Sequence, residues 1–445
     1  ICPSRGLGDV YKRQVLDEPS VGLHPEDTTK LISILQNLRS IGNTVIIVEH
    51  DEDIIRSADQ IIDLGPGAGT LGGEVVAQGS LNHIIKSKTI TAKYLQNQNE
   101  IPIPSKRRIS NRKIVLKGCR ENNLKNINIS FPLNSLVCVT GISGSGKTTL
   151  VKKILYPALL QSKGIYTTKP GQFSSISGNL DDISTIEFID QNPIGQSSRS
   201  NPVTYIKAYD DIRNLFAKQS ASKQFSFKPK HFSFNVDGGR CDDCKGEGTI
   251  KVEMQFMADI NLICETCKGK RFKKNVLQVT YQNKNIDDIL KMTIDEGYNF
   301  FHENGQNKIA NKLKALIDVG MGYVNLGQSS STLSGGEAQR IKLASFILKG
   351  QSAAKTLFIF DEPTTGLHFH DIKKLLNSFN HLISYGHSII VVEHNIELIK
   401  SSDYIVDLGP YGGIKGGELI FEGPPEKLVK NKKSLLTKFL KTKLG

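Results

Sequence analysis

The sequence predicts an α/β protein with parallel or mixed sheets flanked by helices, and two observations carry this prediction. Short apolar runs that are typical of buried strands alternate with helical patterns along the chain. The arrangement also occurs twice, because the tract Asp17–His24 returns as Asp361–His368 after 344 residues. The same offset relates Val48–His50 to Val392–His394. This gapless register indicates two copies of one functional unit.

The first copy is predicted to be the back half of such a unit. A strand is expected from Val15, a helix around 27–40 and a second strand over Thr44–Val48, followed by a glycine-rich turn region. Residues 1–14 show no period, helix cap or apolar face, and we expect them to be a non-native leader. A genuine but divergent N-terminus is the alternative. Residues 15–100 then form the C-terminal half of a first unit.

The second copy has its own opening half, so the second unit spans 101–445. Prolines and a basic run between residues 102 and 108 mark the linker that precedes it. A strand at Leu136–Thr140 leads into a glycine-rich loop and a helix. An insertion at about 160–330 separates this loop from the second acidic strand.

The glycine-rich loop has the pattern of a P-loop. Its glycines allow backbone N–H groups to converge on phosphate oxygens at a helix N-terminus. Lys147 is expected to reach the β- and γ-phosphates of ATP, and the Thr148 hydroxyl to complete the Mg²⁺ shell. The predicted ATP-binding residues are Gly141, Ser143, Gly144, Ser145, Gly146, Lys147, Thr148 and Thr149.

An acid pair and a second glycine motif supply further parts of an ATP site. Asp361 ends an apolar strand, where it is expected to hold Mg²⁺ through water, and Glu362 is placed to activate the attacking water. A solvated turn or a helix cap is the simpler alternative for this pair. A second backbone nest for phosphate is predicted at the start of a helix, at Ser334, Gly335, Gly336 and Glu337.

Together, the P-loop, the Leu-Ser-Gly-Gly-Glu signature and the Asp-Glu-Pro tract resemble the motif set of ABC-type ATPases. The resemblance implies that the signature of one unit closes over the nucleotide held by the other unit's P-loop. It also assigns His394 as the switch histidine near the γ-phosphate and Gln191 as the Q-loop glutamine. Asp17, Glu18 and His50 are the corresponding remnants of the first unit.

The insertion carries two Cys-x-x-Cys pairs separated by nineteen residues. Four thiolates in this spacing predict a tetrahedral structural Zn²⁺ site in a module at about 225–280, and free buried thiols are the alternative. The predicted ligands are Cys241, Cys244, Cys264 and Cys267. This cysteine usage also favours a reducing compartment, and no apolar stretch approaches the ~20 residues that span a bilayer. We therefore expect a cytoplasmic protein without a membrane partner.

A cysteine module between the P-loop and the signature makes the chain resemble the UvrA family, the damage-sensing ATPases of bacterial excinucleases. Matching tracts are Glu121–Asn126, Asp190–Gly195 and Phe232–Asn235, while Ile263 departs from the family's usual proline. The resemblance implies ATP-dependent recognition of DNA damage in nucleotide excision repair. It implies a homodimer that binds distorted duplex DNA and loads the helicase UvrB. The alternative of a UvrA-like paralogue in drug self-resistance stays open, and a transporter ATPase is disfavoured by the cysteine pairs.

The charge of the chain is compatible with DNA as a partner. The net charge is +13, and basic residues crowd around the cysteine pairs. Lys270, Arg271 and Lys273 are the predicted DNA contacts, with a solvated face as the alternative because acidic residues share the segment.

The two copies are predicted to be unequal in their chemistry. The first copy lacks a P-loop in this chain, and the second lacks an opposing signature from the first. We therefore expect the chain to bind ATP but to hydrolyse it poorly, unless two chains pair head to tail.

Overall fold

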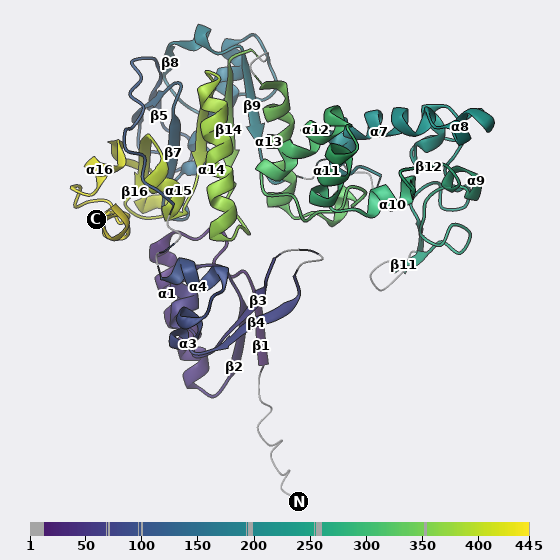
Figure 1. The fold of residues 1–445 in the computed structure, drawn as a ribbon. Coiled ribbons are helices and arrows are strands. Elements are labelled where there is room, and N and C mark those ends of the chain that lie inside the picture. Colours follow the sequence, from purple (N-terminus) through teal and green to yellow (C-terminus); the bar gives the residue numbers. More distant parts are fainter. Residues whose placement is uncertain are drawn as a thin grey trace, which may run out of the picture. The chain divides into compact units, whose positions relative to one another are not determined.

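The computed structural model describes residues 13–444, apart from residues 68, 70, 71, 97, 99, 100, 193, 195–198, 253, 255–259 and 351–353 (Figure 1). The chain forms two compact units. The sheet unit comprises residues up to Asp190 and from Gln351, and the insert unit comprises Gln191–Gly350. The predicted insertion at 160–330 therefore begins, in the structure, with strands that belong to the sheet unit.

The second copy is built on a six-stranded sheet in which five strands run parallel. Only the edge strand β17 is antiparallel to its neighbour. The spatial order is β17 (Glu418–Gly423), β16 (Tyr404–Gly409), β7 (Leu136–Gly141), β15 (Ser388–Val392), β14 (Thr356–Asp361) and β9 (Thr185–Ile189). The apolar run of β14 is buried along its length, which explains why it reads as continuous rather than alternating.

A three-stranded antiparallel sheet packs beside the P-loop strand. Its order is β6 (Ile127–Pro132), β5 (Lys113–Cys119) and β8 (Ser175–Gly178). Ile114 and Phe131 from this sheet share one core with Val137 of β7 and Leu150 of the following helix. The helices of the second copy are η2 (Thr149–Leu155), α5 (Tyr156–Ser162), α14 (Phe369–Ser384), α15 (Ile396–Ser401), α16 (Pro425–Leu428) and α17 (Thr437–Leu444).

The first copy repeats the back half of this unit element by element. Its elements are β1 (Arg13–Asp17), α1 (Pro25–Ser40), β2 (Thr44–Val48), α2 (Glu52–Ser57), β3 (Ile61–Gly65), β4 (Glu74–Gly79), α3 (Leu81–Lys86) and α4 (Ile90–Leu95). At the offset of 344, α1, β2, α2 and β4 have the bounds of α14, β15, α15 and β17. These elements therefore recur at the offset of the duplicated tract. Strand β1 begins inside the predicted leader, whose residues 1–12 lie outside the described part of the chain.

The first copy exposes the sheet face that is core in the second copy. In the second copy β7 pairs with both β15 and β16, whereas β1–β2 and β3–β4 form two separate two-stranded sheets with no described strand between them. Val15 is 67% exposed and Leu64 is 66% exposed, while their equivalents Ile359 and Leu408 are 0% and 1% exposed. The difference arises because β7 and its helix cover only the second copy's strands.

The insert unit is mainly helical and ends in the long helix α13 (Gly335–Lys349). Helix α12 packs against α11 and α13, and the apolar faces of α11 and α12 bury Phe301 and Leu313. Its other elements are α6 (Pro202–Tyr205), α7 (Ala208–Ala217), α8 (Ser220–Gln224), β10 (Thr249–Val252), β11 (Ile260–Ile263), α9 (Lys274–Leu277), β12 (Thr280–Tyr281), β13 (Lys284–Asn285), α10 (Ile286–Lys291), α11 (Ile294–Glu303) and α12 (Asn307–Asp318). Across the described parts of both units, every helix is too short or too polar to span a membrane.

Candidate nucleotide and metal sites

The predicted P-loop lies between β7 and the helix that continues into η2. Lys147 is buried, and its Nζ donates hydrogen bonds to the carbonyl oxygens of Gly141 at 2.8 Å and Ile142 at 2.9 Å. Burial lowers the pKa of Lys147 to about 8, although carboxylates, that of Glu362 first, oppose the shift. The loop thus folds around the ammonium group that is expected to meet phosphate oxygens.

Two glycines of the loop are required by its shape. Gly141 has a φ of 134°, and a Cβ there would lie 2.0 Å from the carbonyl oxygen of Leu408. Gly146 has a φ of 108°, and a Cβ there would lie 2.8 Å from Leu124. A side chain at Gly141 would therefore displace backbone, whereas at Gly146 the positive φ is what disfavours other residues.

The P-loop is braced by two asparagines that the sequence motif alone does not identify. Asn123 Nδ2 donates to the carbonyl oxygens of Gly144 at 2.9 Å and Gly413 at 3.0 Å. Asn122 Nδ2 donates to Thr149 Oγ1 at 3.1 Å. These residues entered the sequence analysis only as part of a family tract. Of the other predicted ATP-binding residues, Ser143, Gly144 and Thr148 are exposed. Ser145 is buried, and its Oγ has no hydrogen-bond partner among the described residues.

The acid pair and the switch histidine meet at the ends of β14 and β15. Glu362 Oε1 lies 3.4 Å from His394 Nε2, and this hydrogen bond lowers the pKa of Glu362. Glu362 has a φ of 49°, which is a left-handed conformation uncommon for a non-glycine residue. Burial raises the pKa of the neighbouring Asp361. The geometry keeps the Glu362 carboxylate ionised near Lys147 of the P-loop and holds Glu362 in a strained turn.

Glu393 holds the turn that carries the switch histidine His394, and the sequence analysis did not predict this function of Glu393. Its buried carboxylate accepts hydrogen bonds from the backbone N–H of Thr364 at 2.8 Å and of His394 at 2.7 Å. Glu49 does the same in the first copy, with Ser20 at 2.8 Å and His50 at 2.9 Å. The duplicated Val-Glu-His tract is the signal that could have identified it.

The remnants of the first copy face the second copy's site within the sheet unit. Glu18 repeats the left-handed turn with a φ of 43°, and its Oε1 lies 3.6 Å from His50 Nδ1. Asp17 ends β1 as Asp361 ends β14. A cavity of about 200 Å³ is lined by residues of both copies, including His50, Glu362 and His394.

The signature and the Q-loop glutamine belong to the insert unit, whereas the P-loop belongs to the sheet unit. Ser334 caps α13 as predicted, because its Oγ accepts from the backbone N–H of Glu337 at 3.3 Å while Glu337 Oε2 accepts from that of Ser334 at 2.8 Å. A Cβ added at Gly335 would lie 2.9 Å from Gln191 Cβ, and Gly336 is buried. The roles of Gln191 and the signature at a nucleotide site stay predictions.

The two cysteine pairs converge in the insert unit as a candidate metal centre. All four sulfur atoms lie within 4.8 Å of one another. The Sγ atoms of Cys241 and Cys264 are 3.9 Å apart, and those of Cys244 and Cys267 are 3.6 Å apart. Zn–S bonds of about 2.3 Å in a tetrahedron require a sulfur separation of about 3.8 Å. Backbone N–H groups, that of Cys267 first, lower the pKa of Cys264 to about 7, whereas burial raises the pKa of Cys241 and of Cys267. The spacing of the four sulfur atoms is what fits Zn²⁺.

The predicted DNA contacts differ in how free their side chains are. Lys270 is exposed. Arg271 is half-buried, with Nη1 donating to the carbonyl oxygen of Gly327 at 3.0 Å and its guanidinium 5.7 Å from the centre of the Phe234 ring. Lys273 forms an ion pair with Asp242 at 2.9 Å. Two of the three cations thus already have partners within the insert unit.

The P-loop follows the buried parallel strand β7, and the acid pair ends β14, which is separated from β7 in the sheet by β15 alone. Together with the serine-capped signature helix, these features define the fold of an ABC-type ATPase. No protein-family model matches the chain. Over 440 residues it is 50% identical to UvrABC system protein A of Staphylococcus epidermidis and 51% identical to that of Clostridium perfringens, which covers 98% of the chain and 46% of each relative.

Comparison of the fold with solved structures also finds a protein named UvrA2. The crystal structure of UvrA2 from Deinococcus radiodurans matches with a TM-score of 0.90 at 39% identity, over 97% of this chain and 52% of that one. The chain therefore spans about half the length of the relatives it matches. The resemblance to UvrA predicted from the motifs is confirmed.

Proposed function

We propose that the chain is part of an ATP-dependent DNA damage recognition protein of bacterial nucleotide excision repair. In this proposal the protein works in the cytoplasm as a homodimer, binds distorted duplex DNA and loads the helicase UvrB. The observation that carries the proposal is the identity of 50% to UvrABC system protein A over 98% of the chain. Recognition of many lesions by one protein implies that DNA shape and deformability are read, rather than base edges.

The chain's part in this function is ATP binding at the second copy. Lys147 and the backbone of the P-loop bind the phosphates. Thr148 and Asp361 would hold Mg²⁺, which would neutralise charge on the phosphoryl oxygens. Glu362 orients and deprotonates the attacking water, and His394 orients Glu362 through their contact at 3.4 Å. The exposed apolar face of the first copy supports the proposal that an upstream P-loop half completes it. Hydrolysis by the chain alone is then poor.

The proposal is tested by measuring ATP turnover with and without lesion-containing duplex. The chain is compared with the same chain extended by its native upstream sequence, and UvrB loading is measured on the extended protein. Turnover that appears only in the extended protein and responds to lesions supports the proposal. Lesion-independent turnover without UvrB loading would instead favour the UvrA-like paralogue, a second candidate that the match to a protein named UvrA2 supports.

The pH dependence of ATP binding is expected to follow Lys147. Its pKa is lowered to about 8, so the ammonium group is present at pH 7 and is mostly lost at pH 9. Since phosphate binding requires the charged form, ATP affinity should fall about tenfold between pH 7 and pH 9. The measurement is titration of a fluorescent ATP analogue at several pH values. A Lys147→Ala variant should bind weakly with no such dependence, and an equal dependence in that variant would assign the effect to another group.

Phosphate contacts on DNA are proposed for the exposed lysines beside the zinc ligands. Lys268 and Lys270 are exposed, so a Lys268→Ala, Lys270→Ala double variant should lose two contacts. The slope of log affinity against log salt should then become shallower by about 1.8. Lys314→Ala on α12, whose side chain is 51% exposed, is the matched control. Fluorescence anisotropy of a labelled duplex at several salt concentrations provides the measurement.

Unchanged affinity and slope in the double variant would reject this contact. Arg271→Ala and Lys273→Ala, at the other two predicted positions, remove internal contacts as well as charge. Zinc retention and thermal stability must therefore be measured for these two variants before any loss of DNA binding is assigned to phosphate contact.

A further inference from the structure

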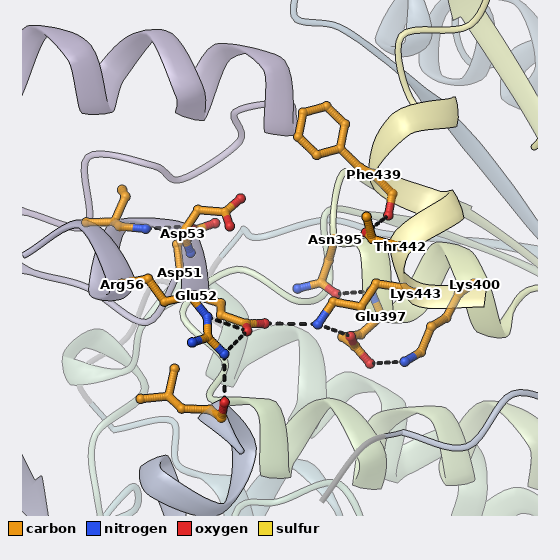
Figure 2. Close-up of polar contacts among 12 residues, drawn as sticks. Asp51, Glu52, Asp53, Arg56, Asn395, Glu397, Lys400, Phe439, Thr442 and Lys443 are labelled. Carbon is orange, nitrogen blue, oxygen red and sulfur yellow. Dashed lines mark hydrogen bonds and ion pairs between the residues drawn. The ribbon is translucent and has the colours of Figure 1, made fainter. Parts of the chain in front are cut away.

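The C-terminal helix α17 connects the two copies through one lysine (Figure 2). Lys443 Nζ lies 3.0 Å from Glu52 Oε2 on α2 and 3.5 Å from Glu397 Oε1 on α15. These two helices occupy equivalent places in the duplicated units, each directly after a switch-histidine turn. Lys443 therefore bridges the same structural element of both copies.

Each carboxylate also has a cation within its own copy. Arg56 lies 2.7 Å from Glu52, and the buried Lys400 lies 2.7 Å from Glu397, as Figure 2 shows. The carboxylates of Glu52 and Glu397 raise the pKa of Lys443 although burial opposes the shift, so the bridge is charged at neutral pH. Removing Lys443 leaves neither acid without a partner. What the lysine adds is the link between copies.

A second set of contacts places α17 against the turn that begins α1. Lys438 forms an ion pair with Glu26, and the Phe439 ring meets the His24 ring edge-on with centroids 6.3 Å apart. His24 caps α1 by accepting a hydrogen bond at Nδ1 from the backbone N–H of Glu26 at 3.2 Å. The helix thus contacts the first copy at the start of both α1 and α2.

The capping histidine in turn contacts the second copy's site. Its ring is 1% exposed and lies edge-on to the ring of His394, with centroids 6.3 Å apart. Burial first, and then nearby positive charge, lowers the pKa of His24 to about 3, so the ring is neutral and packs as an aromatic group. His394 carries the contact with Glu362.

We propose that α17 is an intramolecular strap that holds the first copy against the second copy's nucleotide site, and that Lys443 is a positioning residue acting through His24 and His394. The proposal rests on the ATPase function proposed above. It assigns Lys443 no contact with nucleotide. Loss of the Lys443 side chain should therefore leave ATP affinity unchanged and lower turnover, because His394 and Glu362 are then less well oriented.

The test compares Lys443→Ala with Lys443→Arg and with Lys441→Ala. Exchange and the Kd are measured in the 445-residue chain, and turnover is measured in the chain extended by its native upstream sequence. Lys441 is an exposed lysine of the same helix and is the matched control. Hydrogen exchange is measured over residues 20–28 and 52–57, together with the Kd of a fluorescent ATP analogue and the rate of ATP turnover. Lys443→Ala should lose protection at least tenfold in both segments and lose turnover about fivefold, with the Kd changed less than twofold. Lys443→Arg should restore both properties.

Protection in Lys443→Ala equal to that in Lys441→Ala would overturn the strap. Lost protection with turnover unchanged would overturn the positioning function of Lys443. If the extended protein without substitutions shows no turnover, the catalytic part of the proposed function fails. The exchange measurement then decides the strap alone, with lost protection at 20–28 supporting it and unchanged protection rejecting it.

Discussion

Replacing Lys147 with alanine is expected to weaken ATP binding about 100-fold, which corresponds to about 2.7 kcal/mol. The ammonium group is buried in the P-loop and is held by two loop carbonyl oxygens, so it reaches a phosphate with little loss of conformational freedom. A charge-assisted hydrogen bond of this kind is about twice as strong as a neutral one. Titration with a fluorescent ATP analogue measures the effect, since the chain contains no tryptophan.

Lys153→Ala is the matched control for this change. Lys153 is an exposed lysine of η2, six residues after Lys147, and its loss should leave the Kd within twofold. Equal affinities of Lys147→Ala and Lys153→Ala would contradict the assignment of the P-loop as the nucleotide site.

Removal of zinc is expected to unfold the cysteine module without abolishing ATP binding. A structural zinc site contributes about 10–16 kcal/mol of apparent binding free energy, and four sulfurs within 4.8 Å would otherwise repel one another as thiolates. Cys264→Ser should therefore lose one equivalent of zinc and lose hydrogen-exchange protection over 225–280. The P-loop belongs to a separate compact unit, so the Kd for the ATP analogue should change less than threefold.

Metal analysis by mass spectrometry and hydrogen exchange provide the readouts. Cys119→Ala removes a buried thiol of the sheet unit and should retain the metal, which separates loss of a ligand from loss of any thiol. A chain that takes up no zinc, or a Cys264→Ser variant with unchanged protection, would show that the cysteine pairs are packed thiols.

Local patterns in the sequence predicted the parts of the site that depend on neighbours along the chain. The P-loop, the acid pair ending β14 and the serine cap of α13 each lie within a few residues of the element that presents them. The cysteine pairs are nineteen residues apart, but their spacing is itself a metal-binding pattern. The fold of the first copy was also predictable, because a repeated sequence tract implies a repeated fold.

Contacts between distant segments could not be predicted in this way. Asn123 braces the P-loop through Gly413, which is 290 residues away, and Lys443 pairs with Glu52 across 391 residues. An asparagine at a turn and a lysine near a chain end are ordinary surface residues in a sequence. The function of Glu393 could not be predicted for a similar reason, because its carboxylate accepts a hydrogen bond from the backbone N–H of Thr364 in another turn.

The exposed strands of the first copy have a consequence for how the chain behaves in a test tube or a cell. Six large aliphatic side chains are exposed next to unpaired strand edges, and other hydrophobic segments are expected to bind there. They are Val15, Ile46, Val48, Ile62, Leu64 and Val75, each between 50% and 67% exposed. Produced alone, the chain should engage chaperones and form soluble clusters that grow with concentration. Sedimentation velocity over a range of dilutions would show this, and a single mutation such as Leu64→Lys should make the chain markedly more monodisperse.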